Sequence, residues 1–149
     1  MQKVKKVELL KNNVMELFDY DKTRMSVLLH FEEYSNKREM LEVIEFSYCS
    51  PQGNDNLGIF SSRTSDSTAQ KAIKCAEFRN YIEKVDETLK KLKVKLTPDE
   101  KIILEKSILT RHSDEDVATA LSMDKRNIYP KKKSCYIKVA LYYGIEVYK

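Results

Sequence analysis

Apolar side chains recur every three or four residues along most of this chain, which is the spacing of amphipathic helices. The pattern predicts a first helix over residues 3–19, a turn at residues 20–22 and a second helix over residues 22–48. Ser35 and Asn36 could interrupt the second helix. Together these helices form an N-terminal segment of residues 1–48.

The pattern changes in residues 49–67, where Pro51, Gly53 and several Ser and Asn residues replace the apolar positions. Such residues are typical of turns and loops. A loop of this length in a compact domain is either functional or poorly ordered, and we expect partial disorder.

Helical spacing returns in residues 68–95, with Asp66, Ser67 or Thr68 as the expected cap. Cys75 begins a stripe with the alternating three- and four-residue spacing of a heptad repeat. Its other members are Phe78, Ile82, Val85, Leu89 and Leu92. Two alternatives follow: the stripe packs against the N-terminal helices in one bundle, or it forms the seam of a homodimer.

A boundary near Leu96 opens the last segment, residues 96–149. Thr97 is a good N-cap, Pro98 suits the first helical position and Glu100 is placed to complete a capping box. The helix that follows should turn Ile102, Ile103, Ser107 and Ile108 inward and end near residues 110–112.

Two further helices form a helix-turn-helix pattern. Ser113 caps the first, with Asp116 three residues later and Val117, Ala118 and Leu121 on its apolar face. Ser122 and Met123 form the turn, and Asp124 caps the second helix. The apolar positions of that helix are Ile128, Cys135, Val139 and Tyr143.

Three positions of this pattern have backbone consequences. Ser122 occupies a turn position that usually holds Gly, so a positive φ there is unfavourable. Pro130 removes a backbone donor and clashes with the carbonyl of Arg126, so the second helix should either kink or begin later. Gly144 is expected to end it as the C′ residue, with Ile145 making the accompanying hydrophobic contact.

The order of these features over residues 96–147 resembles region 4 of sigma-70-type factors. The matching residues run from Val117 and Ala118 through Leu121, Asp124 and Ile128 to the apolar end at residues 139–145. The wider layout looks like the late-gene transcriptional regulators of phages of Gram-positive bacteria, of the RinA and ArpU type. The resemblance implies a phage or prophage activator that recognises a promoter and could contact RNA polymerase.

The distribution of charge along the chain supports the DNA-binding interpretation. The net charge is only +4, but six basic residues and no acidic one lie between Lys125 and Lys138. We expect Arg126 to pair with guanine and Asn127 with adenine in the major groove, and the lysines mainly to contact phosphates. The residues predicted to contact DNA are Ser113, Lys125, Arg126, Asn127, Tyr129, Lys131, Lys132, Lys133 and Lys138.

The sequence gives no indication of catalysis, cofactor binding or metal binding. Cys49, Cys75 and Cys135 are widely spaced, so reduced thiols are expected and a metal site is not. His30 and His112 are the only histidines, and neither stands in a familiar catalytic arrangement with a Cys or Ser. We therefore predict no catalytic residue, no cofactor and no metal.

The fold class predicted is all-α, because Gly and Pro are scarce and helical spacing dominates. N-terminal helices that bundle or dimerise would precede a sigma-region-4-like helix-turn-helix domain. No apolar run is long enough to span a membrane, so a cytoplasmic protein is expected. The predicted function is sequence-specific regulation of transcription on double-stranded DNA; the alternative is a protein-interaction module that binds RNA polymerase or another regulator without reading DNA.

Overall fold

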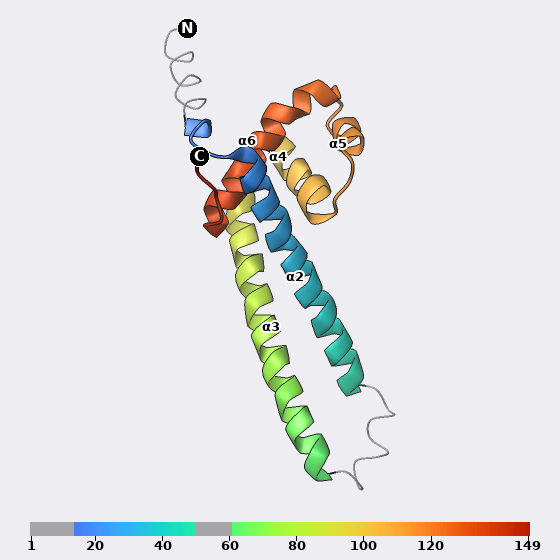
Figure 1. The fold of residues 1–149 in the computed structure, drawn as a ribbon. Helices are drawn as coiled ribbons and strands as arrows, with labels where there is room; N and C mark the ends of the chain where they lie inside the picture. The colour runs from blue at the N-terminus through green and yellow to red at the C-terminus, as the bar shows by residue number, and fades with distance from the viewer. Residues whose placement is uncertain (1–13, 50–60) are drawn as a thin grey trace. The chain divides into compact units, whose positions relative to one another are not determined.

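The structure is a computed structural model that describes residues 14–49 and 61–149. Its helices are α2 (Tyr20–Cys49), α3 (Ser61–Lys95), α4 (Pro98–Ile103), the π-helix η2 (Leu104–Leu109), α5 (Asp114–Ala120) and α6 (Lys125–Tyr143) (Figure 1). Within the described residues the only extended pairing is an isolated bridge between Phe18 and Tyr148. The all-α prediction is confirmed.

The helices belong to two compact units. One joins the residues up to Phe31 with Thr88–Lys149, and the other is Glu32–Glu87. Both α2 and α3 contribute to each unit, so the units do not follow the predicted segment limits near residues 48, 68 and 96.

Three predicted boundaries are wrong: the turn at residues 20–22, the possible break at Ser35 and Asn36, and the start of α3. Residues 20–22 lie inside α2, which begins at Tyr20 because Asp19 Oδ1 accepts a hydrogen bond from the amide of Lys22. The same helix passes through Ser35 and Asn36 without a break, since both residues are exposed and neither is Gly or Pro.

The helix α3 begins at Ser61, which corrects the expected start at residues 66–68 and the end of the predicted loop. Its first turns lack Gly and Pro, so Ser and Thr there are compatible with a helix. The rest of the predicted loop, residues 50–60, and most of the predicted first helix, residues 3–13, lie outside the described residues.

In the unit Glu32–Glu87, α2 and α3 form an antiparallel pair (Figure 1). Tyr34 donates its hydroxyl hydrogen bond to Asp86, and Arg79 Nη2 lies 2.6 Å from Glu45 Oε1. Cys75 and Val85 of the heptad stripe are buried in this unit, while Phe78 and Ile82 are half-buried. This packing is compatible with the bundle alternative, because most of the stripe is buried within the chain.

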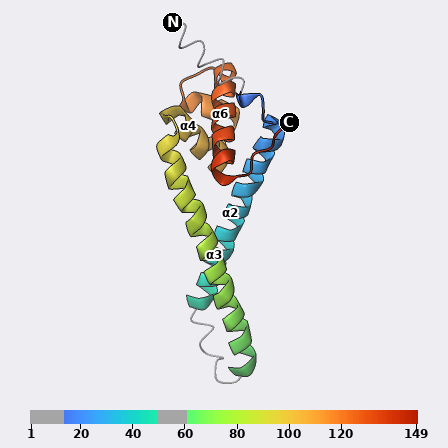
Figure 2. The ribbon, with the colours of Figure 1, turned by 90° about the vertical axis from the view of Figure 1, so that its left-hand side faces the viewer.

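The other unit encloses the helix-turn-helix. Figure 2 shows α6 running between α4 and the first turns of α2. Leu89 and Leu92, the remaining stripe residues, are buried in it. Its largest fully buried side chains include Tyr136, Leu92, Ile103, Leu104, Ile108, Ile128 and Ile137. α6 is therefore part of the core along most of its length.

The C-terminal end of the chain holds the start of α2 in this unit. The amide of Asp19 donates to the carbonyl of Val147 at 2.8 Å, and the amide of Lys149 donates to Leu17 at 3.1 Å. Thr23 is fully buried; its hydroxyl donates to the Val147 carbonyl and accepts from the Val147 amide. These bonds fix the first turn of α2 beside the end of α6.

Candidate nucleic-acid interface

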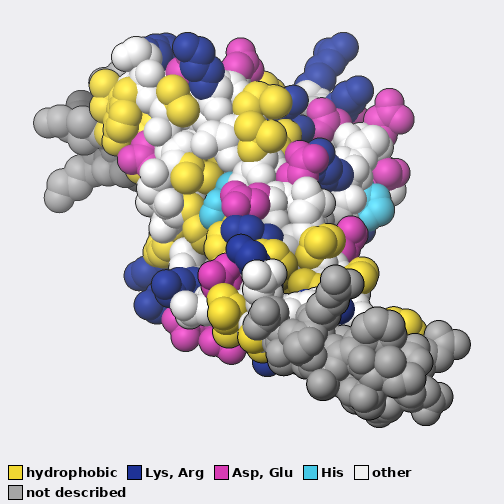
Figure 3. Space-filling model, turned by 60° about the horizontal axis from the view of Figure 1, so that its bottom comes forward, with side chains coloured by type: hydrophobic (Ala, Val, Ile, Leu, Met, Phe, Trp, Pro, Cys, Tyr) yellow, Lys and Arg dark blue, Asp and Glu magenta, His cyan; other side chains and the backbone are white. Residues whose placement is uncertain are grey.

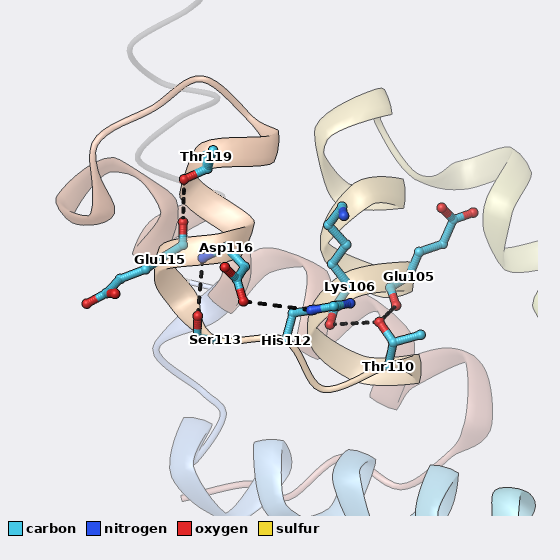
Figure 4. A network of polar contacts seen from close by, with 8 residues as sticks. All are labelled: Glu105, Lys106, Thr110, His112, Ser113, Glu115, Asp116 and Thr119. Carbon is cyan, nitrogen blue, oxygen red and sulfur yellow. Dashed lines mark hydrogen bonds and ion pairs between the residues drawn. The ribbon is translucent and has the colours of Figure 1, made fainter.

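The start of α5 follows a tightly bonded turn, shown in Figure 4. Thr110 Oγ1 donates to the carbonyls of Glu105 and Lys106, which closes the end of η2. Ser113 Oγ then accepts from the amide of Asp116 at 3.2 Å, so the predicted N-cap is confirmed. The Ser113 hydroxyl acts as the acceptor in this bond, which leaves its O–H donor for another partner.

The turn between α5 and α6 has the strain predicted from its sequence. Ser122 has a φ of +52°, in the left-handed region where a side chain is unfavourable. The amide of Met123 donates to the carbonyl of Ala118 at 3.0 Å, which holds the turn closed. Asp124 occupies the N-cap of α6, although its side chain accepts no hydrogen bond there.

Pro130 lies inside α6, which nevertheless begins at Lys125, as the capping pattern predicted. The proline ring is exposed, so the helix accommodates it on the solvent side. The predicted later start of the helix is thus not found. At the other end, Gly144 has a φ of +66°, and Ile145 donates to the carbonyl of Ala140 at 3.0 Å, which confirms the predicted C-cap.

The first turn of α6 presents the predicted base-reading residues to solvent. Lys125, Arg126 and Asn127 are all exposed, while Ile128 is buried and anchors the turn. Tyr129 is 56% exposed, with its ring edge-on to Tyr20 at 5.8 Å between centroids. This turn is therefore exposed on its outer side and packed against the core on its inner side.

The lysines farther along α6 behave differently from the prediction. Lys132 is buried, and its Nζ lies 2.6 Å from Asp114 Oδ1. Lys138 Nζ lies 2.8 Å from the buried Glu100, and Lys131 pairs with Asp99. These three ammonium groups join α6 to the starts of α4 and α5, so we do not count them among phosphate contacts.

Two of the six basic residues of α6, Lys125 and Lys133, make weaker interactions within the chain. Lys125 Nζ is 3.7 Å from Glu115, and both side chains are largely exposed. Lys133 Nζ lies 5.9 Å from the centre of the Tyr20 ring, near the limit of a cation–π contact. With Arg126, these residues make up the charge of α6 that remains available to an anion.

The acidic partners were missed by the sequence reasoning, although a signal was present. Asp99, Glu100 and Asp114 stand in the first turns of α4 and α5, where carboxylates suit the helix dipole. The same location brings them against α6. Residues 97–116 contain six acidic and three basic residues, and this acidic excess is used in part for ion pairs with α6.

Behind the interface, aromatic and thiol groups are neutral and buried. Ser107 and Tyr136 share a hydrogen bond of 3.0 Å between their oxygens, so the Tyr136 hydroxyl is held in the interior. Burial raises the pKa of Tyr20 and of Tyr136. Burial also raises the pKa of the Cys135 thiol to about 12, so this thiol is protonated at neutral pH.

Among residues 14–49 and 61–149, no group of His, Cys, Asp and Glu could hold a metal ion. No helix of this described part is long and apolar enough to cross a membrane. Comparisons of the chain with protein-family models, curated proteins and solved structures give no match.

Proposed function

We propose that this chain is a DNA-binding regulator of transcription that inserts the first turn of α6 into the major groove. The observation that carries the proposal is the exposed sequence Lys125, Arg126 and Asn127 at the start of a helix whose opposite side is anchored in the core. A second helix of a helix-turn-helix reads base edges with residues at this position.

The chemistry of the three side chains fits this role. Arg126 can donate two hydrogen bonds to guanine, and the amide of Asn127 can pair with adenine. Lys125 and Lys133 are the residues we assign to phosphates, because neither is held in a close ion pair. Tyr129, more than half exposed beside them, could contact sugar or a thymine methyl.

Internal ion pairs support the proposal in a second way. Lys131, Lys132 and Lys138 are tied to three different carboxylates, two of them in α4 and one in α5. These ion pairs with α4 and α5 help to fix the orientation of α6 within its unit. A pre-set helix loses little conformational freedom on binding, which improves affinity.

The resemblance to sigma region 4 and to RinA- and ArpU-type regulators adds a biological setting. A promoter would be the DNA target, a phage or prophage late-gene promoter in particular, and RNA polymerase a second partner. The same resemblance leads us to propose activation as the outcome of binding.

One observation favours the alternative function, a protein-interaction module that does not read DNA. Four of the six basic residues between Lys125 and Lys138 lie within 4 Å of a carboxylate, so much of the charge of α6 is neutralised internally. Exposed Leu141 and Tyr142 near the end of α6 would then contribute to a polymerase-binding surface.

The deciding experiment selects duplexes from a random DNA library with the intact protein and with single variants. The intact protein should enrich one motif, and Asn127→Ala should lose preference at an adenine position within it. Arg126→Ala should lose preference at a guanine. Lys101→Ala, an exposed lysine on α4, serves as the control and should select the original motif.

If the intact protein enriched no sequence while remaining folded, base reading by α6 would be rejected. Uniform weakening of all sequences by Arg126→Ala would instead make this residue a phosphate contact.

A further inference from the structure

The unit Glu32–Glu87 consists of two helices, and each helix covers only one side of the other. Helices in stable bundles bury a stripe against several neighbours. The sides turned away from the pair are therefore informative about what else this unit contacts.

The outer side of α2 carries an apolar ridge of Met40, Val43 and Phe46. Their side chains are 53%, 63% and 78% exposed. Val43 lies about 200° around the helix from the half-buried Leu41, so it faces away from α3. Three large apolar residues at a spacing of three are not needed for the pairing of α2 with α3.

Beside the ridge, α2 and α3 enclose an open groove of about 510 Å³. Ile44 of α2 and Ile73 of α3 give it an apolar lining, and Ile73 is 58% exposed. Lys71, Lys74 and Glu77 line it as well. Hydrophobic side chains are likewise seen at the surface among charged ones on the face shown in Figure 3.

The ridge and the groove carry opposite charge. Glu39 and Glu42 flank the ridge; both are exposed, and neither forms an ion pair with another described residue. At the groove, Lys74 pairs with Glu77 at 3.3 Å, which leaves Lys71 exposed without such a partner. An acidic ridge therefore lies on the same unit as a groove with a basic residue at its edge.

We propose that a second copy of this chain covers both features, with the ridge of each copy seated in the groove of the other. A two-fold axis requires that the same patch meet itself, and a ridge with an adjacent complementary groove meets that condition. Four helices from two antiparallel pairs then enclose one apolar centre, as in a four-helix bundle.

Charge selects this pairing over contact between the two α2 ridges. Ridge against ridge would bring Glu39 and Glu42 of one copy against the same residues of the other, and like charges oppose such a contact. Ridge in groove brings Glu42 toward Lys71 of the partner copy instead. The heptad stripe of α3 takes no part, because four of its six residues are buried within the chain and the other two are half-buried.

The test is the mass of the full chain in solution, measured without DNA by sedimentation at protein concentrations of about 1–100 µM. The intact protein should be a dimer over much of this range. Phe46→Glu should raise the dimer dissociation constant by about 100-fold or more, because both copies lose a buried aromatic contact. Val94→Glu changes an equally exposed apolar residue outside this unit and should leave the dimer intact.

A charge exchange tests the partner surface. Glu42→Lys and Lys71→Glu should each weaken the dimer by about 3- to 10-fold, and the double variant should recover most of the loss. Circular dichroism checks that each variant keeps its helical content. A monomeric intact protein at every concentration would overturn the proposal, as would a dimer that Phe46→Glu leaves unchanged. Because no DNA is present, either result is independent of DNA binding.

Discussion

Replacing Lys132 with alanine separates the structural lysines of α6 from those we assign to DNA. Its side chain is 11% exposed, and its Nζ lies 2.6 Å from Asp114. Removing one partner of a fully buried ion pair costs about 3–5 kcal/mol. Asp114 is 43% exposed and can be hydrated, so we reduce this to about 1–2 kcal/mol.

The lysine stem adds a second contribution. Alanine loses three methylenes, worth at most about 2.4 kcal/mol at about 0.8 kcal/mol each. Lys132→Ala should therefore lower the free energy of unfolding by about 3 kcal/mol, and the melting temperature by about 6–12 °C. Lys132→Met keeps most of the stem and should lose only about 1–2 kcal/mol.

Urea denaturation followed by circular dichroism measures these differences. Lys101→Ala, an exposed control, should stay within about 0.5 kcal/mol of the intact protein. An unchanged stability of Lys132→Ala, together with weaker DNA binding by the folded variant, would refute the assignment of Lys132 to an internal ion pair.

Three other changes probe the fold around the interface. Ser122→Gly should raise the free energy of unfolding by about 0.5–1 kcal/mol, and with it the melting temperature, because glycine accepts the positive φ without steric cost. A lower melting temperature would contradict the strained turn. Thr23→Val should lower the free energy of unfolding in urea by about 1–3 kcal/mol, since the part-buried Val147 amide would lose its acceptor, and no loss would mean that the C-terminal end does not hold α2. Above pH 9 the free energy of unfolding should fall, because the Cys135 thiol ionises in the unfolded chain while its pKa in the folded protein is about 12. Thermal melts at pH 8 and pH 10 measure this loss, and Cys135→Ala should remove the contribution of Cys135 to it.

Local chemistry explains which parts of the fold could be predicted. The caps at Thr97, Ser113 and Gly144 depend on neighbouring residues and were predicted correctly. The starts of α2 and α3 were not, because Ser, Asn and Thr fit a helix start, a helix interior or a loop. The π-helix η2 was also missed, since its buried positions Leu104, Ser107 and Ile108 have the spacing of an ordinary helix.

The candidate site shows a different limit. Helical spacing placed Lys125, Arg126 and Asn127 at the start of α6, and all three are exposed. The roles of Lys131, Lys132 and Lys138 depend on carboxylates that are 18 to 38 residues away in sequence. A run of basic residues gives total charge, but only tertiary packing tells which charges are already paired.

Duplex binding across a salt series, followed by fluorescence anisotropy, tests the central claim most directly. Two double variants of α6 are compared with the intact protein: Lys125→Gln with Lys133→Gln, and Lys131→Gln with Lys138→Gln. If the start of α6 contacts phosphates, the first should reduce the slope of log affinity against log salt by about 2, at about 0.9 per phosphate, and the second should leave it unchanged. Absence of binding by the intact protein at low salt, or equal slopes for all three proteins, would contradict DNA recognition by α6.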